Sequence, residues 1–310
     1  MPAKDNTENR QKTKCIIPWT LTPQMSNAHG GIGKMVVKIY SKNAAYQKFE
    51  VLKTNRNKRY RYNEFFAEGV RNINQAVKNG WEINSFIYSG EAALSDWAKD
   101  MLKNVRTQTN YELTSALMAE LSSKEDTSEL LAVIKMREDN LKSIPLGENP
   151  LIVLLDKPSN KGNLGTILRS CDSFGVNGVI ITGHAVDLYE PDVISASMGS
   201  FFNVNCVRVN DNTTLFNYIQ YLRSKYENMQ IIGTTAHKQH SIYNLNLRSP
   251  SLIMIGNETF GLNSSLKAAC DLLATIPMSE HSSASSLNIG CAATVFLYEA
   301  ARQRSKKDFC

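Results

Sequence analysis

The 310-residue chain has no long hydrophobic run and no cysteine pattern that would bind a metal. No apolar run reaches the roughly 18 residues that span a bilayer, and residues 1–10 lack the hydrophobic core of a signal peptide. The six cysteines include no Cys-x-x-Cys pair and no Cys/His cluster at zinc spacing. These absences predict a cytoplasmic protein with reduced cysteines and no resident metal.

The second half of the chain has almost no net charge, whereas the first half is clearly basic. The formal net charge is +6, of which residues 1–150 contribute +5 and residues 151–310 only +1. The segment Lys53–Arg61 holds five cations in nine residues, beside two tyrosines. Such a segment suits phosphate contacts with base stacking nearby, although a solvated charged turn would look the same. Its candidate nucleic-acid contacts are Lys53, Arg56, Lys58, Arg59 and Arg61.

The first half of the chain predicts an extension followed by a small α/β unit. Residues 1–33 contain prolines and a glycine run without a phosphate-loop pattern, which indicates a flexible N-terminal extension. Residues 34–145 alternate short apolar runs with amphipathic segments. We expect a strand or helix start at 35–40, strands at 64–66 and 83–88, helices at 70–79, 96–105 and 113–119, and a strand or helix at 130–136.

The second half, residues 146–310, follows a turn-rich linker at 142–150 and alternates strands with helices. The expected strands are 151–155, 179–181, 203–209, 230–234, 252–255 and 272–276. The expected helices are 164–174, 192–200, 213–226 and 286–304. This alternation predicts a mostly parallel sheet covered on both faces, and ligands bind such sheets at the carboxyl ends of the strands.

Three polar segments follow the expected strands. They are Asn163–Arg169, Gly256–Gly261, and Ile276–Met278 with the downstream Ser286–Asn288. Arg169 lies off the apolar stripe of its helix, and a glutamate between the two glycines of the second segment is placed to hold that arginine. Taken singly, each segment also fits an ordinary loop or helix start.

Together the three segments resemble the signature motifs of the SpoU (TrmH-like) RNA ribose 2′-O-methyltransferases of the SPOUT superfamily. The family pattern is Asn-x-Gly-x-x-x-Arg, then Gly-Asn-Glu-x-x-Gly, then Ile-Pro-Met with Ser-Leu-Asn, and every element is present in order. The loop 279–285 is serine-rich where many relatives have a glycine. This loop and residues 182–189 resemble the 23S rRNA thiostrepton-resistance branch. Residues 45–145 resemble, on weaker motifs, the L30e-like substrate-binding domain of the family.

The resemblance implies a SPOUT fold with a trefoil knot in the catalytic domain of residues 146–310, and an L30e-like RNA substrate-binding domain at 34–145. It also implies S-adenosyl-L-methionine as cofactor and a homodimer through the catalytic domain. The matching catalytic positions are Asn163, Arg169, Glu258, Ser286 and Asn288. The matching cofactor-binding positions are Thr234, Ile255, Gly256, Asn257, Gly261, Ile276, Met278 and Leu287.

The implied reaction is in-line attack of a ribose 2′-oxygen on the methyl group of the cofactor. A guanidinium keeps its proton above about pH 12, so stabilising a developing alkoxide is an easier role for Arg169 than acting as the base. The L30e-like domain favours ribosomal over transfer RNA. The rival interpretations are a tRNA 2′-O-methyltransferase, a base methyltransferase, and a non-catalytic RNA-binding or ribosome-assembly protein. The intact catalytic set disfavours the last of these, and the Ser-Leu-Asn motif disfavours base methylation.

Overall fold

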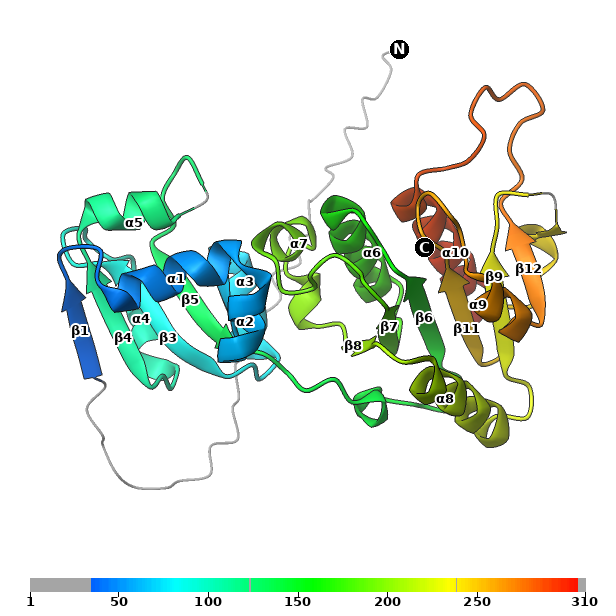
Figure 1. Ribbon diagram of the computed structural model, residues 1–310, viewed down its shortest axis with the longest axis horizontal. Coiled ribbons are helices and arrows are strands. Elements are labelled where there is room, and N and C mark those ends of the chain that lie inside the picture. The colour runs from blue at the N-terminus through cyan, green and yellow to red at the C-terminus, as the bar shows by residue number, and fades with distance from the viewer. Residues whose placement is uncertain (1–34, 123, 238, 306–310) are drawn as a thin grey trace, which may run out of the picture. The chain divides into compact units, whose positions relative to one another are not determined.

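The computed structural model describes residues 35–122, 124–237 and 239–305 (Figure 1). The extension expected at 1–33 falls outside these residues. Within the described ranges, no helix is long and apolar enough to cross a membrane. Two sheets and the helices that cover them make up the described chain.

The first sheet is mixed and has the order β1-β4-β3-β5-β2. Strand β4 pairs parallel with β1 and β3, whereas β5 pairs antiparallel with β3 and β2. The strands are β1 (Met35–Ile39), β2 (Glu64–Glu68), β3 (Ile83–Ser89), β4 (Thr109–Leu113) and β5 (Leu130–Lys135). The helices are α1 (Ala44–Thr54), α2 (Arg56–Tyr62), α3 (Val70–Lys78), α4 (Asp96–Asn104) and α5 (Ser115–Leu121).

Both segments left open between strand and helix are strands, namely β1 and β5. Strand β4 was not predicted, and the helix expected at 113–119 begins after the N-cap Thr114. The basic segment is helical rather than a turn, because Asn55 both ends α1 and caps α2. Its side chain accepts a hydrogen bond from the backbone of Lys58, which supplies one of the helix's unpaired N–H groups with a partner.

The second sheet has seven strands in the order β10-β12-β9-β11-β6-β7-β8, and all its pairings are parallel. The strands are β6 (Leu151–Asp156), β7 (Gly178–Thr182), β8 (Cys206–Val209), β9 (Gln230–Thr234), β10 (His240–Ser241), β11 (Ser251–Ile255) and β12 (Leu272–Thr275). The helices are α6 (Lys161–Ser173), α7 (Pro191–Ala196), α8 (Asn212–Lys225), α9 (Ser264–Ala269) and α10 (Ile289–Arg304), with 3-10 turns η1 (Leu141–Ser143), η2 (Ser200–Phe202) and η3 (Ile242–Asn244). The expected parallel α/β architecture is confirmed.

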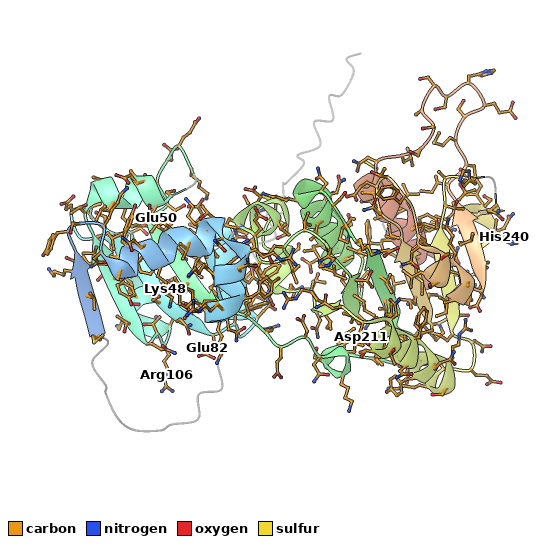
Figure 2. All side chains as sticks on the ribbon, viewed as in Figure 1. Lys48, Glu50, Glu82, Arg106, Asp211 and His240 are labelled. Atoms are coloured by element: carbon orange, nitrogen blue, oxygen red, sulfur yellow. The ribbon has the colours of Figure 1, made fainter. Side chains whose placement is uncertain are left out.

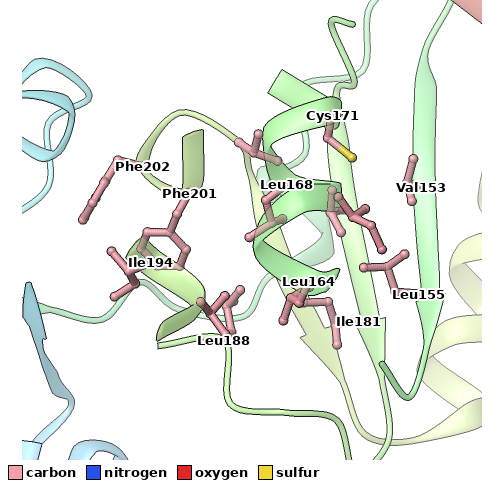
Figure 3. Close-up of a cluster of buried hydrophobic side chains, with 14 of the residues drawn as sticks. Val153, Leu155, Leu164, Leu168, Cys171, Ile181, Leu188, Ile194, Phe201 and Phe202 are labelled. Carbon is pink, nitrogen blue, oxygen red and sulfur yellow. The ribbon is translucent and has the colours of Figure 1, made fainter. Parts of the chain in front are cut away.

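The central strand β6 is buried along its whole length. Val153 and Leu155 belong to the apolar cluster that includes Leu164, Leu168 and Cys171 of α6 (Figure 3). The alternate residues of β6 belong to a second cluster with α8 and α9. Because successive side chains of a strand point to opposite faces, a strand covered on both sides needs the continuous apolar run that predicted it.

The last helix differs from its predicted bounds. Helix α10 begins at Ile289, and Asn288 is its N-cap, so Ser286 lies in the preceding loop. The Asn288 side chain accepts hydrogen bonds from the backbone of Gly290 and Cys291. That cap fixes where the chain turns into the helix. The trefoil knot stays a prediction from the resemblance.

Candidate active site

The three sequence motifs lie at one edge of the seven-stranded sheet. Strands β6, β11, β9 and β12 are consecutive neighbours and run parallel, so the loops that follow them leave the sheet at the same edge. The loop after β12 is the long orange loop that leads into α10 in Figure 1. The sheet therefore gathers residues that are more than 90 positions apart in sequence.

Glu258 holds the loop between β6 and α6. One carboxylate oxygen accepts hydrogen bonds from the backbone N–H (3.0 Å) and the hydroxyl (2.6 Å) of Ser159. The other accepts from the backbone N–H of Asn160 at 3.1 Å. Partial burial raises the pKa of Glu258, but the hydrogen bonds from Ser159 and Asn163 outweigh burial, so its pKa lies below the ordinary value. Glu258 is thus an ionised acceptor at neutral pH.

Asn163 joins the three motifs through its side-chain amide. Its Nδ2 donates to Glu258 at 3.4 Å, and its Oδ1 accepts from Nδ2 of Asn288 at 3.1 Å. Asn163 stands in the first turn of α6, where Asn160 is the N-cap. The amide therefore bridges the second and third motifs at the start of two helices.

Arg169 and Ser286 do not join this hydrogen-bond chain. The expected contact between Glu258 and Arg169 is wrong for this structure, because the carboxylate is occupied by the loop ahead of α6. Arg169 lies six residues beyond Asn163 on the helix, which corresponds to about 9 Å along its axis. Both Arg169 and Ser286 are exposed, and within the described residues neither side chain has a hydrogen bond or ion pair.

The second motif forms a closed turn. Asn257 and Gly261 exchange two backbone hydrogen bonds of 3.0 and 2.9 Å. Gly261 has φ +66°, and a Cβ on Gly256 would lie 2.2 Å from the carbonyl carbon of Gly261, so both positions require glycine. The side chain of Asn257 donates to the backbone carbonyl of Lys157 at 2.7 Å. That amide ties the turn to the loop after β6.

The candidate cofactor positions fall at the ends of three neighbouring strands. Thr234 ends β9, Ile255 ends β11, and Ile276 follows β12. The backbone of β9 and β12 stays paired up to the hydrogen bond from the N–H of Thr235 to the carbonyl of Ala274. Beyond that point Ile276 and Met278 are half-buried, and the loop after β11 forms the closed turn of Asn257–Gly261. Apolar side chains beside turned backbone fit a nucleoside cofactor, because its adenine needs apolar contacts and backbone hydrogen bonds.

The basic segment divides into buried and exposed cations. Arg59 is 2% exposed and pairs with Asp187 at 2.6 Å, so it is excluded as an RNA contact. Lys53 is half-buried and bonds to the carbonyl of Leu121, while Arg56 is exposed and reaches the carbonyl of Ala185 at 2.9 Å. Within the described ranges, the two other cations, Lys58 and Arg61, make no ion pair.

Sequence reasoning missed the partners of these groups. The motifs gave no indication that Ser159 and Asn160 donate hydrogen bonds to Glu258. Asn160 stands three residues before Asn163, which is the spacing of an N-cap to the N–H that it bonds, and that signal could have found it. Asp187 gave no comparable signal, because nothing near it in sequence marks it as a partner for a cation.

Comparison with known families agrees with both halves of the chain. Residues 150–298 match the SpoU rRNA Methylase family, and residues 43–132 match the SpoU L30e-like domain. A 23S rRNA (uridine(2479)-2′-O)-methyltransferase from Streptomyces viridochromogenes is 39% identical over 281 residues, which cover 90% of this chain and 97% of the relative.

Solved structures resemble the fold over most of its length. The SpoU methyltransferase AviRb from Streptomyces viridochromogenes, in complex with the cofactor AdoMet, has a TM-score of 0.80 at 40% identity, covering 85% of this chain and 98% of that chain. An AdoMet-bound rRNA methyltransferase from Sinorhizobium meliloti has a TM-score of 0.74 at 26% identity, covering 86% and 98%. The chain therefore belongs to the SpoU rRNA methylase family.

Proposed function

We propose that the protein transfers a methyl group from S-adenosyl-L-methionine to a ribose 2′-hydroxyl of ribosomal RNA. The observation that carries this proposal is the hydrogen-bond chain from Glu258 through Asn163 to Asn288. It ties all three motifs to one edge of the sheet, whereas a protein that only binds RNA has no need of such an arrangement. The relatives' names, 23S rRNA 2′-O-methyltransferases, support ribosomal RNA as the substrate class.

Catalysis requires alignment of two reactants and stabilisation of one developing charge. S-adenosyl-L-methionine supplies a methyl group on a positively charged sulfur. Glu258, Asn163 and Asn288 hold the loops that shape the site. Arg169, exposed on the same helix as Asn163, stabilises the developing alkoxide and grips a neighbouring phosphate, while Ser286 lies in the loop that approaches the ribose. A guanidinium suits this role because it stays charged and offers several N–H donors.

The cofactor is held by the loops after β9, β11 and β12. Backbone groups around Gly256, Ile276 and Met278 make its polar contacts, and Ile255 and Leu287 supply apolar surface. Leu287 is 40% exposed in the described chain, so it is free to cover a bound nucleoside. Thr234, Asn257 and Gly261 shape the same loops.

The protein acts as a homodimer through helix α10. Cys291, Val295 and Tyr298 lie at i, i+4 and i+7 on the outer face of this helix, and all are exposed. An exposed apolar stripe of this kind on a helix fits burial against a second copy. Pairing through α10, which packs on α6, brings Arg169 close to the interface.

The decisive experiment incubates the purified protein and methyl-labelled cofactor with one RNA pool per tube: total ribosomal RNA, assembled ribosomal subunits, or transfer RNA. Cofactor binding is measured in parallel by calorimetry. Nucleoside mass spectrometry then identifies the product. We expect a 2′-O-methyl nucleoside in a ribosomal RNA pool. A methylated base, or labelling of transfer RNA alone, would replace the proposal. Absence of both labelling and cofactor binding would favour a non-catalytic RNA-binding protein.

A further inference from the structure

A polar cleft of about 460 Å³ lies at the carboxyl ends of β6, β7 and β8. Its walls include Lys157, Thr182, His184, Asn210, Asn263 and Ser265. The proposed cofactor loops follow β9, β11 and β12, so this cleft lies toward the other end of the same sheet edge. It meets those loops where residues 263–266, which follow β11, line it. Parallel sheets bind ligands at this edge, and the volume suits a nucleotide-sized group.

The acidic groups of the cleft are already engaged. Asp156, on its floor, is buried and accepts hydrogen bonds from the hydroxyl of Thr182 (3.1 Å) and from the backbone and side chain of Asn263 (2.8 and 2.9 Å). Asp211, labelled in Figure 2, does not line the cleft but lies between two residues that do, Asn210 and Asn212. It caps α8 by accepting from the backbone of Thr214 at 2.7 Å. The carboxylates therefore bind protein donors, and an incoming anion meets no unsatisfied acceptor.

Lys157 provides the free positive charge of the cleft. It is exposed, and within the described residues its side chain makes no ion pair or hydrogen bond. Its backbone has φ +52°, a left-handed conformation that costs a side-chain-bearing residue of order 1 kcal/mol or more. Asn257 holds that conformation through the carbonyl of Lys157. The hydrogen bond from Asn257 thus holds the backbone of Lys157 beside the turn that carries Glu258.

The stem of Lys157 lies across Gly183. A Cβ at Gly183 would come within 2.8 Å of Cε and 2.9 Å of Cγ of Lys157. Gly183 also has φ +62°. A glycine here leaves the lysine room to lie along the backbone, and this restricts where its ammonium can go.

The cleft continues toward the basic segment. A neighbouring cavity of about 200 Å³ shares Gly183 and Asn210 with it and is lined by Arg56 and Arg208. Arg56 belongs to the proposed RNA-binding surface. The two cavities therefore bring together Arg56, Lys157 and Arg208, of which Arg208 is paired with Asp139. Successive cations of this kind follow the backbone of a single-stranded nucleic acid.

We propose that this strand-end cleft binds a phosphodiester of the substrate RNA adjacent to the nucleotide that is methylated, with Lys157 as its cation. The proposal rests on the RNA methyltransferase function and extends it by assigning a binding subsite. RNA is the occupant that fits, because the exposed Lys157 is the cation of the cleft and makes no ion pair within the described residues. The carboxylate of Asp156 is buried and directed to Thr182 and Asn263. Amides and hydroxyls line the cleft beside the apolar side chains of Val209, Leu215 and Leu266.

The test measures binding of a 23S rRNA transcript at several salt concentrations without cofactor. Lys157→Gln keeps the long stem and removes the charge, so the slope of log K against log salt should fall by about 0.9 and low-salt affinity by about three- to tenfold. The Ser265 side chain makes no hydrogen bond within the described residues, so Ser265→Trp fills the cleft without breaking one and should also weaken binding. The control is Lys225→Gln, an exposed lysine at the far end of α8, about 20 Å from the turn that lines the cleft; it should change neither quantity.

Cofactor binding, measured by calorimetry on the same variants, separates the explanations. Wild-type affinity for S-adenosyl-L-methionine together with weakened RNA binding supports the subsite. Wild-type RNA affinity and slope in Lys157→Gln overturn it, and so does loss of cofactor affinity in either variant, which would assign the cleft to the cofactor. If Lys157→Gln fails to fold, Ser265→Trp decides. RNA binding is measured without methyl transfer, so the two proposals can fail separately. If the wild-type protein binds RNA through Lys157 but methylates no RNA, the subsite stands and only the proposed reaction is refuted.

Discussion

The strand-end loops and the basic segment Lys53–Arg61 place their polar groups in different ways. Glu258, Asn163 and Asn288 follow buried strands or begin helices, and they bond to one another across the sheet edge. In the basic segment, Arg59 enters the interior while its neighbour Lys58 stays near the surface. Position after a buried strand thus predicts where a polar group lies, whereas charge density along a helix does not.

The interior arginine is held by a complete set of partners. Its guanidinium bonds to Asp187 at 2.7 and 2.6 Å and to the carbonyls of Leu52 and Lys53 at 3.0 Å each. Tyr60 donates to the other oxygen of Asp187 at 2.7 Å, and burial together with this carboxylate raises the pKa of Tyr60 to about 12. A buried pair in which each of the three guanidinium nitrogens has a partner is tolerated, but removal of one partner leaves an uncompensated charge.

The largest effect is expected from substitution of Arg169, the proposed catalytic residue on α6. Arg169→Ala should lower the rate of methyl transfer by at least about 10²–10³-fold, because a donor aimed at a developing charge is lost. Arg169→Lys should also be poor, since the planar fork is lost. Single-turnover methylation gives the rate, and calorimetry should find cofactor affinity unchanged. Normal turnover in Arg169→Ala would remove this residue from the mechanism.

The second effect separates the two neighbouring cations of the basic segment. Arg59→Met should destabilise the protein by about 3–5 kcal/mol, because Asp187 would remain buried without its partner. Lys58→Met, the matched surface control, should change stability by less than about 0.5 kcal/mol. Urea unfolding measures both. Equal stabilities would mean that the Arg59–Asp187 pair contributes nothing in solution.

The sequence predicted the strands that are covered on both faces, because β6, β7 and β11 are unbroken apolar runs. It did not predict β4, because Asn110 and Glu112 interrupt the pattern. Asn110 is buried, and its side chain accepts a hydrogen bond from the backbone of Phe86 at 3.0 Å. From the sequence alone, a buried polar side chain that bonds to the backbone of a neighbouring strand cannot be told from a loop residue.

The sequence motifs predicted that Glu258, Asn163 and Asn288 lie at one edge of the sheet, but not which groups they contact. Glu258 was found from the turn that carries it, but its true partner, Ser159, depends on the pairing of β11 with β6, which sets Ile255 opposite Leu155. The burial of Arg59 likewise depends on a residue 128 positions away. Local patterns contain no information about such pairings, which arise only when the strands assemble.

A third prediction concerns the cations that remain at the surface. Replacement of Arg56, Lys58 and Arg61 by glutamine should weaken RNA binding and lower the salt slope by up to about 3, since each phosphate contact releases about one counterion. Because none of the three is buried, the fold should remain intact. Salt titration of RNA binding measures the slope, with thermal unfolding as the control. An unchanged slope would refute this surface.

A fourth, smaller effect follows from the lowered pKa of Glu258. A carboxyl group with a lowered folded-state pKa stabilises the protein above its unfolded value and loses that contribution as pH falls through the folded value. Glu258→Gln should therefore be less stable than wild type at pH 7, by no more than about 1 kcal/mol because the carboxylate is only partly buried. The difference should shrink as pH falls below the ordinary glutamate pKa of 4.5. A difference that stays constant with pH would show that ionisation of Glu258 does not stabilise the loop.

The last prediction compares the alkylation rates of two cysteines, the exposed Cys291 of α10 and the buried Cys171 of α6. Cys291 is exposed, whereas Cys171 is buried and burial raises the pKa of its thiol. Since the thiolate is the reactive form, iodoacetamide should label Cys291 at least about tenfold faster than Cys171 in dilute protein. Site-resolved mass spectrometry measures both rates. If α10 forms the homodimer interface, labelling of Cys291 should slow as protein concentration rises, while the rate at Cys171 stays the same. Concentration-independent labelling of Cys291 would place the dimer contact elsewhere.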